Sequence, residues 1–224
     1  MTVTIYRELE QGSEEWLQAR CGLLTASTIG RLITPTLKVA DNEGSRGLAL
    51  TLAAERITGV PEHVPPTLDM QRGHDDEPFA RLAYAEHYAP VEEVGFITLE
   101  QNGYKLGYSP DGLVDSAGVV EIKSRKAPIQ VKTILDGSVP TANRMQLQCG
   151  LFVSGREWAD YISYRDGLPL FVTRVYPDPN AFAVIDEVAR KFEADVAAVI
   201  ERYEAAAAGF PFIERRPELE DIRI

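Results

Sequence analysis

The chain has 224 residues, of which 45% are hydrophobic and 25% are charged, so its composition is that of a globular protein and excludes disorder throughout. Its 34 acidic and 23 basic side chains give a net charge of −11, which argues against a protein that coats nucleic acid by electrostatics alone. No apolar run approaches the length of about 18 residues that indicates a membrane span, and residues 1–10 do not look like a secretory signal. Two cysteines in a chain with no export signal lead us to expect reduced thiols and a cytoplasmic protein.

The first third of the chain is predicted to be mainly helical. Ser13 is suited to cap a short helix that ends near Cys21, and Thr25 or Ser27 is expected to begin another. An Ala- and Leu-rich helix over 47–57 should stop at Gly59. A further helix is expected from the Gly73 region to residue 87, with Pro78 in its first turn or at a kink.

The middle of the chain changes to short runs of β-branched and aromatic residues. These runs, at 94–99, 104–108, 113–114 and 119–123, are separated by Asn102-Gly103 and other turn sequences, which predicts an antiparallel meander. A helix over 143–153 and two strands at 161–164 and 170–176 are expected to follow. A long amphipathic helix over 180–208 should come next, and the tail from Pro211 is expected to be only partly ordered.

These elements predict an α/β protein with a central mixed sheet flanked by helices. We find no repeat or linker that would mark a domain boundary. We therefore expect a single domain over 1–224, with a helical part at about 1–90, a sheet core at about 91–176 and the long helix after it.

The residues most suited to chemistry lie between 108 and 123. Asp111 occupies a Pro-Asp-Gly turn, and Glu121 and Lys123 share one face of a later strand because side chains alternate along a strand. A hairpin between the two strands would bring Asp111 within reach of Glu121. Two carboxylates beside the backbone carbonyl of Ile122 would suit Mg²⁺. The alternative is an exposed ion pair at a strand end and an ordinary turn aspartate.

Charge is unevenly distributed around this segment. Residues 61–120 hold 3 basic and 11 acidic side chains, whereas residues 121–160 hold 6 basic and 4 acidic ones. An acidic segment followed by a basic one is consistent with a metal site facing a phosphate site, although random variation in surface charge would give similar counts.

Four blocks in order resemble the PD-(D/E)xK nuclease superfamily and, within it, the phage lambda exonuclease and YqaJ-like viral recombinase family. They are residues 11–27 with Trp16 and Arg20, Gly73-His-Asp-Asp-Glu77, the Ser-Pro-Asp-Gly and Glu-Ile-Lys pair around Asp111 and Glu121, and Gln146-Leu-Gln148. The resemblance spans residues 11–155 and implies a restriction-endonuclease-like core.

The resemblance also implies roles for individual residues. Glu77, Asp111, Glu121 and the Ile122 carbonyl would hold the metal, Lys123 would be the catalytic lysine, and Gln148 would bond to the lysine, to water or to DNA. Arg20, Ser27 and Ser109 would hold the 5′-phosphate or the scissile strand. The family's additional basic phosphate ligand falls here on Ile129, so Arg125 or Lys126 would have to replace it.

The activity implied is a Mg²⁺-dependent exonuclease, with Mn²⁺ as a substitute, that degrades linear duplex DNA 5′ to 3′ and leaves 3′ overhangs. A toroidal homotrimer, a single-strand annealing protein as partner and a bacterial host cell come from the same resemblance. The alternatives are a restriction-like or structure-specific endonuclease on the same core and, from another class, a non-catalytic DNA-end-binding module. The acidic balance then predicts that DNA contact is confined to a narrow channel around the metal.

Overall fold

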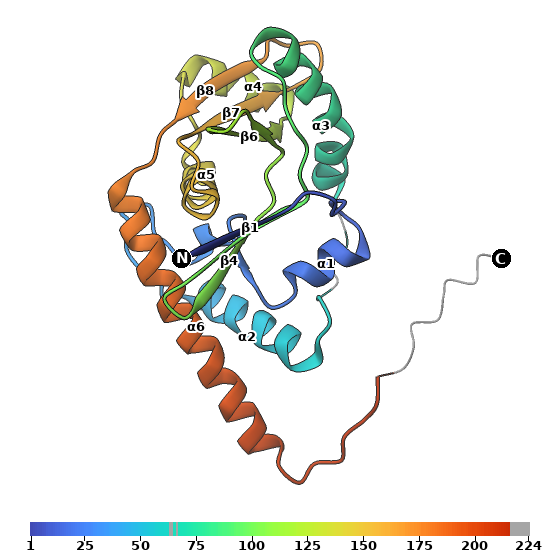
Figure 1. Cartoon of the computed structure of the whole chain (residues 1–224), viewed down its shortest axis with the longest axis vertical. Coiled ribbons are helices and arrows are strands. Elements are labelled where there is room, and N and C mark those ends of the chain that lie inside the picture. The colour runs from blue at the N-terminus through green and yellow to red at the C-terminus, as the bar shows by residue number, and fades with distance from the viewer. Residues whose placement is uncertain (63–64, 66, 216–224) are drawn as a thin grey trace, which may run out of the picture.

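The computed structural model describes residues 1–62, 65 and 67–215, and Figure 1 shows how its elements are arranged. The helices are α1 (Glu14–Arg20), α2 (Glu43–Thr58), α3 (Leu68–His87), α4 (Ala127–Asp136), α5 (Thr141–Ser154) and α6 (Pro179–Ala207), with a 3₁₀ turn η1 at Ile29–Arg31. The strands are β1 (Thr2–Tyr6), β2 (Leu24–Thr25), β3 (Phe96–Gln101), β4 (Tyr104–Tyr108), β5 (Gly112–Val114), β6 (Gly118–Ser124), β7 (Trp158–Tyr164) and β8 (Phe171–Val175).

The first sheet has the strand order β1-β3-β4-β2. Strands β3 and β4 form the predicted hairpin, and Asn102 and Gly103 at its tip both have positive φ, 49° and 80°, as a tight two-residue turn requires. Strand β2 runs parallel to β4, with Leu24 opposite Leu106. The residues that follow β2 and β4 therefore leave the sheet at the same end.

The second sheet has the order β5-β6-β7-β8. Strand β6 pairs antiparallel with β5 and parallel with β7, so it is a central strand bonded on both sides. The predicted continuous meander is wrong at one point, because the chain passes from the first sheet to the second between Tyr108 and Gly112. The predicted α/β class is confirmed, with the strands divided between two mixed sheets.

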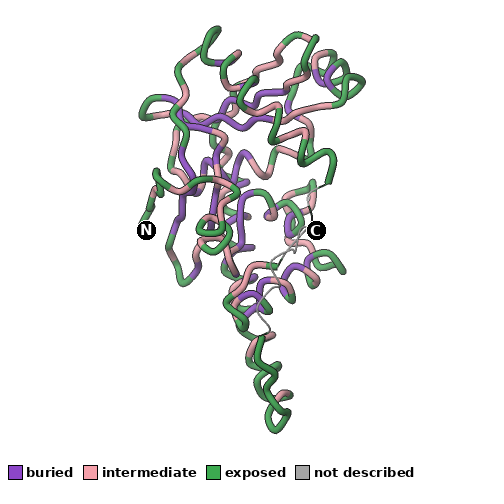
Figure 2. Tube along the Cα trace, turned by 90° about the vertical axis from the view of Figure 1, so that its right-hand side faces the viewer, coloured by how far each residue is buried: buried purple, intermediate pink, exposed green. Residues whose placement is uncertain are grey.

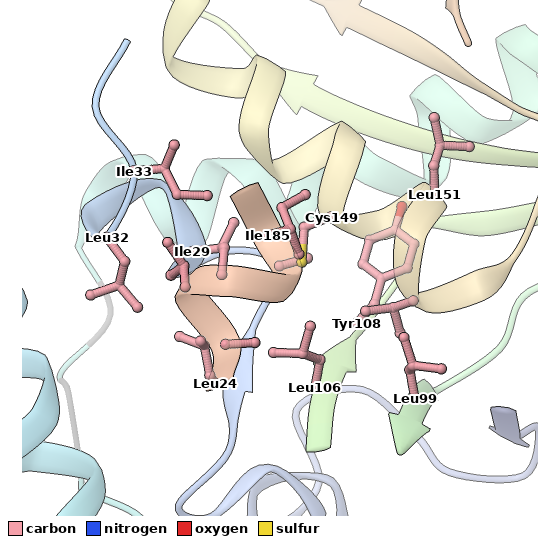
Figure 3. Packing of buried hydrophobic residues seen from close by; sticks show 14 of the residues in the cluster. Leu24, Ile29, Leu32, Ile33, Leu99, Leu106, Tyr108, Cys149, Leu151 and Ile185 are labelled. Atoms are coloured by element: carbon pink, nitrogen blue, oxygen red, sulfur yellow. The ribbon is translucent and has the colours of Figure 1, made fainter. Parts of the chain in front are cut away.

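Helix α5 joins the two sheets, because it packs against β3 and β4 of the first and β7 of the second. Its buried residues Leu147, Cys149 and Leu151 belong to a large apolar core that includes side chains from both sheets. Figure 3 shows residues of β2, β4, α5 and α6 gathered in this core. Burial of this apolar surface is the main favourable contribution to folding.

Several predicted helices differ in extent from those observed. The helix expected from Thr25 or Ser27 is only the 3₁₀ turn η1, because Thr25 is engaged in β2. Helix α3 begins earlier than predicted, at Leu68 with Thr67 as its cap, and therefore contains Pro78 in its interior rather than in its first turn. Strands β1 and β2 and helix α4 were not predicted.

The C-terminal half of α6 extends away from the body and is largely exposed, as Figure 2 shows. The predicted partly ordered tail lies mostly outside the described residues, which end at 215. Within the described part of the chain, no helix is both long and apolar enough to cross a membrane.

The close contact between Gly118 and Trp158 generates a first prediction. A Cβ at Gly118 would lie 2.1 Å from Cη2 of Trp158, its partner across β6 and β7. Gly118→Ala should therefore lower the free energy of unfolding by about 1–3 kcal/mol through overpacking, measured by urea denaturation. Gly47→Ala in α2 is the matched control, since a Cβ there meets nothing within 4 Å and alanine favours the helix. Equal stability of both variants would contradict this reading of the β6–β7 contact.

Candidate active site

The centre of the site is the hairpin formed by β5 and β6. Gly112 pairs with Val120, and the Asp111 carboxylate extends beyond the end of β5 to accept a hydrogen bond of 2.5 Å from the backbone N–H of Ile122. The N–H and C=O of one strand residue point to the same side, so the Ile122 carbonyl faces the same space as Asp111. The structure thus brings Asp111, Glu121 and the Ile122 backbone together, as the predicted hairpin required.

The Glu121 side chain is buried, with its residue only 1% exposed, and three groups contact its carboxylate. Lys123 Nζ donates at 2.5 Å and Gln146 Nε2 donates to the same oxygen, Oε1, while the Tyr108 hydroxyl donates to Oε2 at 3.1 Å. The donors come from β6, α5 and β4. The position of the carboxylate therefore depends on the packing of both sheets against α5.

The two glutamines of the Gln146-Leu-Gln148 motif lie in different environments. Gln148 Nε2 donates to the Tyr176 carbonyl and its Oε1 accepts from the Asp178 N–H, so its amide secures the chain ahead of α6 and does not reach the carboxylates. Gln146, which was not among the predicted site residues, is the glutamine of this motif that contacts the Glu121 carboxylate. Residues two apart point in nearly opposite directions on a helix, whereas Gln146 shares a face with Gly150, which packs on the Tyr108 ring.

Burial, together with repulsion between neighbouring carboxylates, shifts the pKa values in the site. Burial and the nearby Glu121 raise the pKa of Asp111 well above its ordinary value, although Lys123 opposes the shift. Burial also raises the pKa of Glu77, against the effect of Arg81. Burial alone would lower the pKa of Lys123, but Glu121 and Asp111 outweigh it and raise the pKa, so the lysine is a cation at neutral pH.

Glu77 reaches this region from α3. Its carboxylate accepts a hydrogen bond from Arg81, one helical turn later, and is close enough to Glu121 for the two charges to interact. A cleft of about 560 Å³ opens onto Glu77 and Asp111, and its walls come from residues 7–12, Trp16, α3 and Glu93. The site is therefore accessible from one side.

The turn that carries Asp111 is tied down at each of three successive residues. Ser109 Oγ accepts hydrogen bonds from Arg20 at 2.9 Å and from the Trp16 indole at 3.0 Å. The Pro110 carbonyl accepts from the Gln11 amide at 2.8 Å, and the Asp111 carbonyl accepts from Arg81 at 3.0 Å. All four donors come from the helical part of the chain. That part therefore positions the turn from outside the sheets.

Arg20 and Ser109, two of the predicted phosphate ligands, are in direct contact. The Arg20 guanidinium also lies 4.2 Å from the centre of the Trp16 ring. Burial lowers the pKa of Arg20 to about 10, with Glu55 opposing the shift, so the side chain keeps its charge at neutral pH. Ser27 is exposed, and its Oγ lies 3.0 Å from Thr25 Oγ1. It follows β2 at the same end of the sheet at which Ser109 follows β4.

Arg125 and Lys126, the other two basic candidates, follow β6. Arg125 donates to the Asn143 side chain at 2.6 Å and to the Tyr161 hydroxyl at 2.7 Å, and its buried Nε has no partner among the described residues. Lys126 is exposed and lies 3.3 Å from Asp69. In the part of the chain that the structure describes, no hydrogen bond or ion pair joins either residue to Asp111, Glu121 or Glu77, so they flank the site at the start of α4.

The donor set fits a hard divalent cation. Among the described residues, no three His, Cys, Asp or Glu side chains are grouped closely enough to hold a metal by themselves. Mg²⁺ is usually bound by one or two carboxylates and completed by water and substrate phosphate. Asp111, Glu121 and the Ile122 carbonyl supply such a partial set. A cation beside them would offset the burial and the repulsion from Glu121 that raise the pKa of Asp111.

The fold and the site together define a class: a mixed α/β protein in which one hairpin carries an Asp that lines a cleft and a Glu–Lys pair behind it. Residues 15–157 match the model of the YqaJ-like viral recombinase domain. The chain belongs to this family, as the resemblance in its sequence indicated. No match was found among curated protein sequences.

Solved structures of exonucleases share the fold of this chain. The chain is 33% identical to the alkaline exonuclease LHK-Exo from Laribacter hongkongensis, with a TM-score of 0.77 over 88% of this chain and 98% of that one. The structure of LHK-Exo in complex with dAMP matches with the same identity and coverage and a TM-score of 0.75. A phage-related exonuclease from Haemophilus somnus 129PT shares the fold, with 12% identity, a TM-score of 0.58 and coverage of 80% of this chain and 96% of that one.

The different environments of the two glutamines generate a second prediction. Gln148→Ala should lower the free energy of unfolding by about 1–3 kcal/mol, because it leaves two backbone groups ahead of α6 without their partner. Gln146→Ala should cost less, since Glu121 keeps its bonds to Lys123 and Tyr108. Urea denaturation of both variants measures the difference, and a larger loss for Gln146→Ala would contradict it.

Proposed function

We propose that this protein is a Mg²⁺-dependent exonuclease that degrades linear duplex DNA from its 5′ ends and leaves 3′ single-stranded overhangs. The observation that carries the proposal is the arrangement of Asp111, Glu121 and Lys123 on one hairpin beside the cleft. Membership of the viral recombinase family supports it, as does the 33% identity to an alkaline exonuclease over nearly all of that protein's length.

In this proposal Asp111, Glu121 and the Ile122 carbonyl hold the cation, with Glu77 as a further ligand from α3. Bound Mg²⁺ supplies Lewis-acid stabilisation of the phosphodiester oxygens and a more acidic water. Tyr108 and Gln146 keep the Glu121 carboxylate in one orientation. The Lys123 ammonium lies on the same strand face as Glu121 and orients the attacking water and the scissile phosphate.

The 5′-phosphate is proposed to bind at Arg20, Ser109 and Ser27. Arg20 is held in a fixed orientation by Ser109 and the Trp16 ring, so little side-chain entropy is lost when it binds an anion. The binding of dAMP by LHK-Exo supports a site for a terminal deoxynucleotide in this family. Arg125 and Lys126 would contact the DNA backbone beside the catalytic strand.

The wider setting of the proposal follows from the family. We infer a toroidal homotrimer that encloses the duplex, a single-strand annealing protein that takes over the overhang, and action in the cytoplasm of a bacterial host. The net charge of −11 fits contact with DNA that is confined to a channel around the metal, because the remaining acidic surface repels the phosphate backbone.

Replacing Glu121 tests the catalytic assignment. Glu121→Gln keeps the shape of the side chain but removes the charge that would bind Mg²⁺, so degradation of linear duplex DNA should fall by on the order of 10³-fold. Far-UV circular dichroism should show an unchanged fold. Glu187→Gln on the exposed face of α6 is the matched control and should keep full activity. Undiminished Mg²⁺-dependent degradation by Glu121→Gln would rule out this site.

Defined DNA substrates test the polarity and the choice of an exonuclease. With strand-specific labels, the 5′-terminated strand of a linear duplex should shorten, while a covalently closed circle should stay intact. Shortening from 3′ ends would overturn the polarity, and cleavage of the circle would favour an endonuclease.

Arg20 gives a separate prediction about the substrate end. A charge-assisted hydrogen bond to phosphate is worth about 1.5–3 kcal/mol, so wild-type protein should degrade 5′-phosphorylated duplexes roughly 10- to 100-fold faster than 5′-hydroxyl duplexes. Arg20→Gln should lower this ratio toward one, measured as initial rates on the two substrates. A ratio unchanged by the substitution would place the phosphate elsewhere.

A further inference from the structure

Arg81 lies beside the proposed metal ligands but has no role in the function proposed above. It lies on α3 one turn after Glu77, and its side chain is only 14% exposed. Sequence reasoning did not single it out. In the structure each of its three guanidinium nitrogens bonds to a different part of the chain.

The three contacts are divergent. NH2 donates to the Glu77 carboxylate, Nε donates to the Asp111 carbonyl at 3.0 Å, and NH1 lies 2.8 Å from the Glu93 carboxylate. One planar group therefore spans α3, the turn before β5 and the segment before β3. A lysine ammonium at this position could not make these three bonds with the same geometry, because it is a single point of charge on a flexible chain.

Two of these contacts fix proposed ligands relative to each other. Glu77 and Asp111 come from separate elements, and the Arg81 guanidinium joins the carboxylate of one to the backbone of the other. Asp111 is then held from two sides, since its carboxylate also accepts from Ile122 N–H. We propose that Arg81 is a positioning residue that holds Glu77 and the Asp111 turn at the separation needed to bind a divalent cation; this rests on the proposed function.

Electrostatics and positioning make opposite predictions for the loss of Arg81. If Arg81 merely added positive charge to the cleft, removing that charge would strengthen the binding of the divalent metal ion nearby, because the two positive charges repel each other. If it positions the ligands, removing it should weaken metal binding, because groups that orient metal ligands typically contribute about 10- to 100-fold in affinity or activity. The sign of the change in affinity therefore separates the two roles.

The experiment is calorimetric titration of Mn²⁺ into the DNA-free protein, so that the readout is metal affinity rather than activity. We expect Arg81→Met to weaken Mn²⁺ binding by about 10-fold or more relative to the wild type. Arg81→Lys should bind Mn²⁺ only slightly more tightly than Arg81→Met. Glu93→Gln, which removes the contact that involves no proposed ligand, should cause a smaller loss. In DNA degradation the Mg²⁺ concentration for half-maximal rate should rise with an unchanged KM for DNA.

Arg156→Met is the matched control. Arg156 also donates to a backbone carbonyl, that of Asp115 at 2.7 Å in the turn between β5 and β6, and makes no contact with the carboxylates. The Arg156→Met variant should have the Mn²⁺ affinity of the wild type, whatever the effect of the substitution on thermal stability. If Arg81→Met does not fold, as judged by circular dichroism, the same titration of Arg81→Lys decides the question.

Three outcomes distinguish failure of the positioning role of Arg81 from failure of the proposed function. Mn²⁺ binding by a folded Arg81 variant that is equal to or tighter than that of wild type would overturn the positioning role and leave the proposed function intact. Equal weakening by Arg156→Met would reduce the Arg81 effect to a general loss of stability. Failure of the wild-type protein to bind Mn²⁺ at all would overturn the proposed function together with the role of Arg81.

Discussion

A buried carboxylate at the end of a central strand constrains the rest of this structure. Glu121 is almost completely removed from water, and a buried charge is tolerated only when it is paired and hydrogen-bonded. Its partners Lys123, Tyr108 and Gln146 lie on β6, β4 and α5, so they come from both sheets and the helix between them. Because Gln146 on α5 and Tyr108 on β4 both donate to this carboxylate, the packing of α5 between the two sheets and the geometry of the site are linked.

The helical part of the chain, residues 1–90, holds the turn that carries Asp111. The turn from Ser109 to Asp111 lies where the chain leaves one sheet for the other, so no ladder of strand hydrogen bonds holds it. Side chains from the residues around α1 and from α3 hold it instead, through Arg20, Trp16, Gln11 and Arg81. Side chains that precede Asp111 by 30 residues or more therefore help to position the turn that carries its carboxylate.

Sequence reasoning succeeded where the signal was local and failed where two faces of one element had to be told apart. The Asn102-Gly103 turn and the Ser13 cap were predicted from chemistry that acts over a few residues. Gln146 and Gln148 are both glutamines of one motif, and only the packing of α5 in the folded chain decides that Gln146 is the one that contacts Glu121. Helix α4 escaped prediction because its buried face carries the polar Gln130 and Thr133, which reverses the usual pattern.

The sequence by itself determined the α/β class, the hairpin that brings Asp111 to Glu121, the shared face of Glu121 and Lys123, and the family. Each of these depends on alternation along a strand, turn chemistry or the order of short motifs, all of which are properties of neighbouring residues. Only the tertiary structure decided that the strands form two sheets, that Gln146 rather than Gln148 contacts Glu121, and that Arg81 joins Glu77 to Asp111. These features depend on contacts between residues far apart in the chain, whose geometry is set by how helices and sheets pack together.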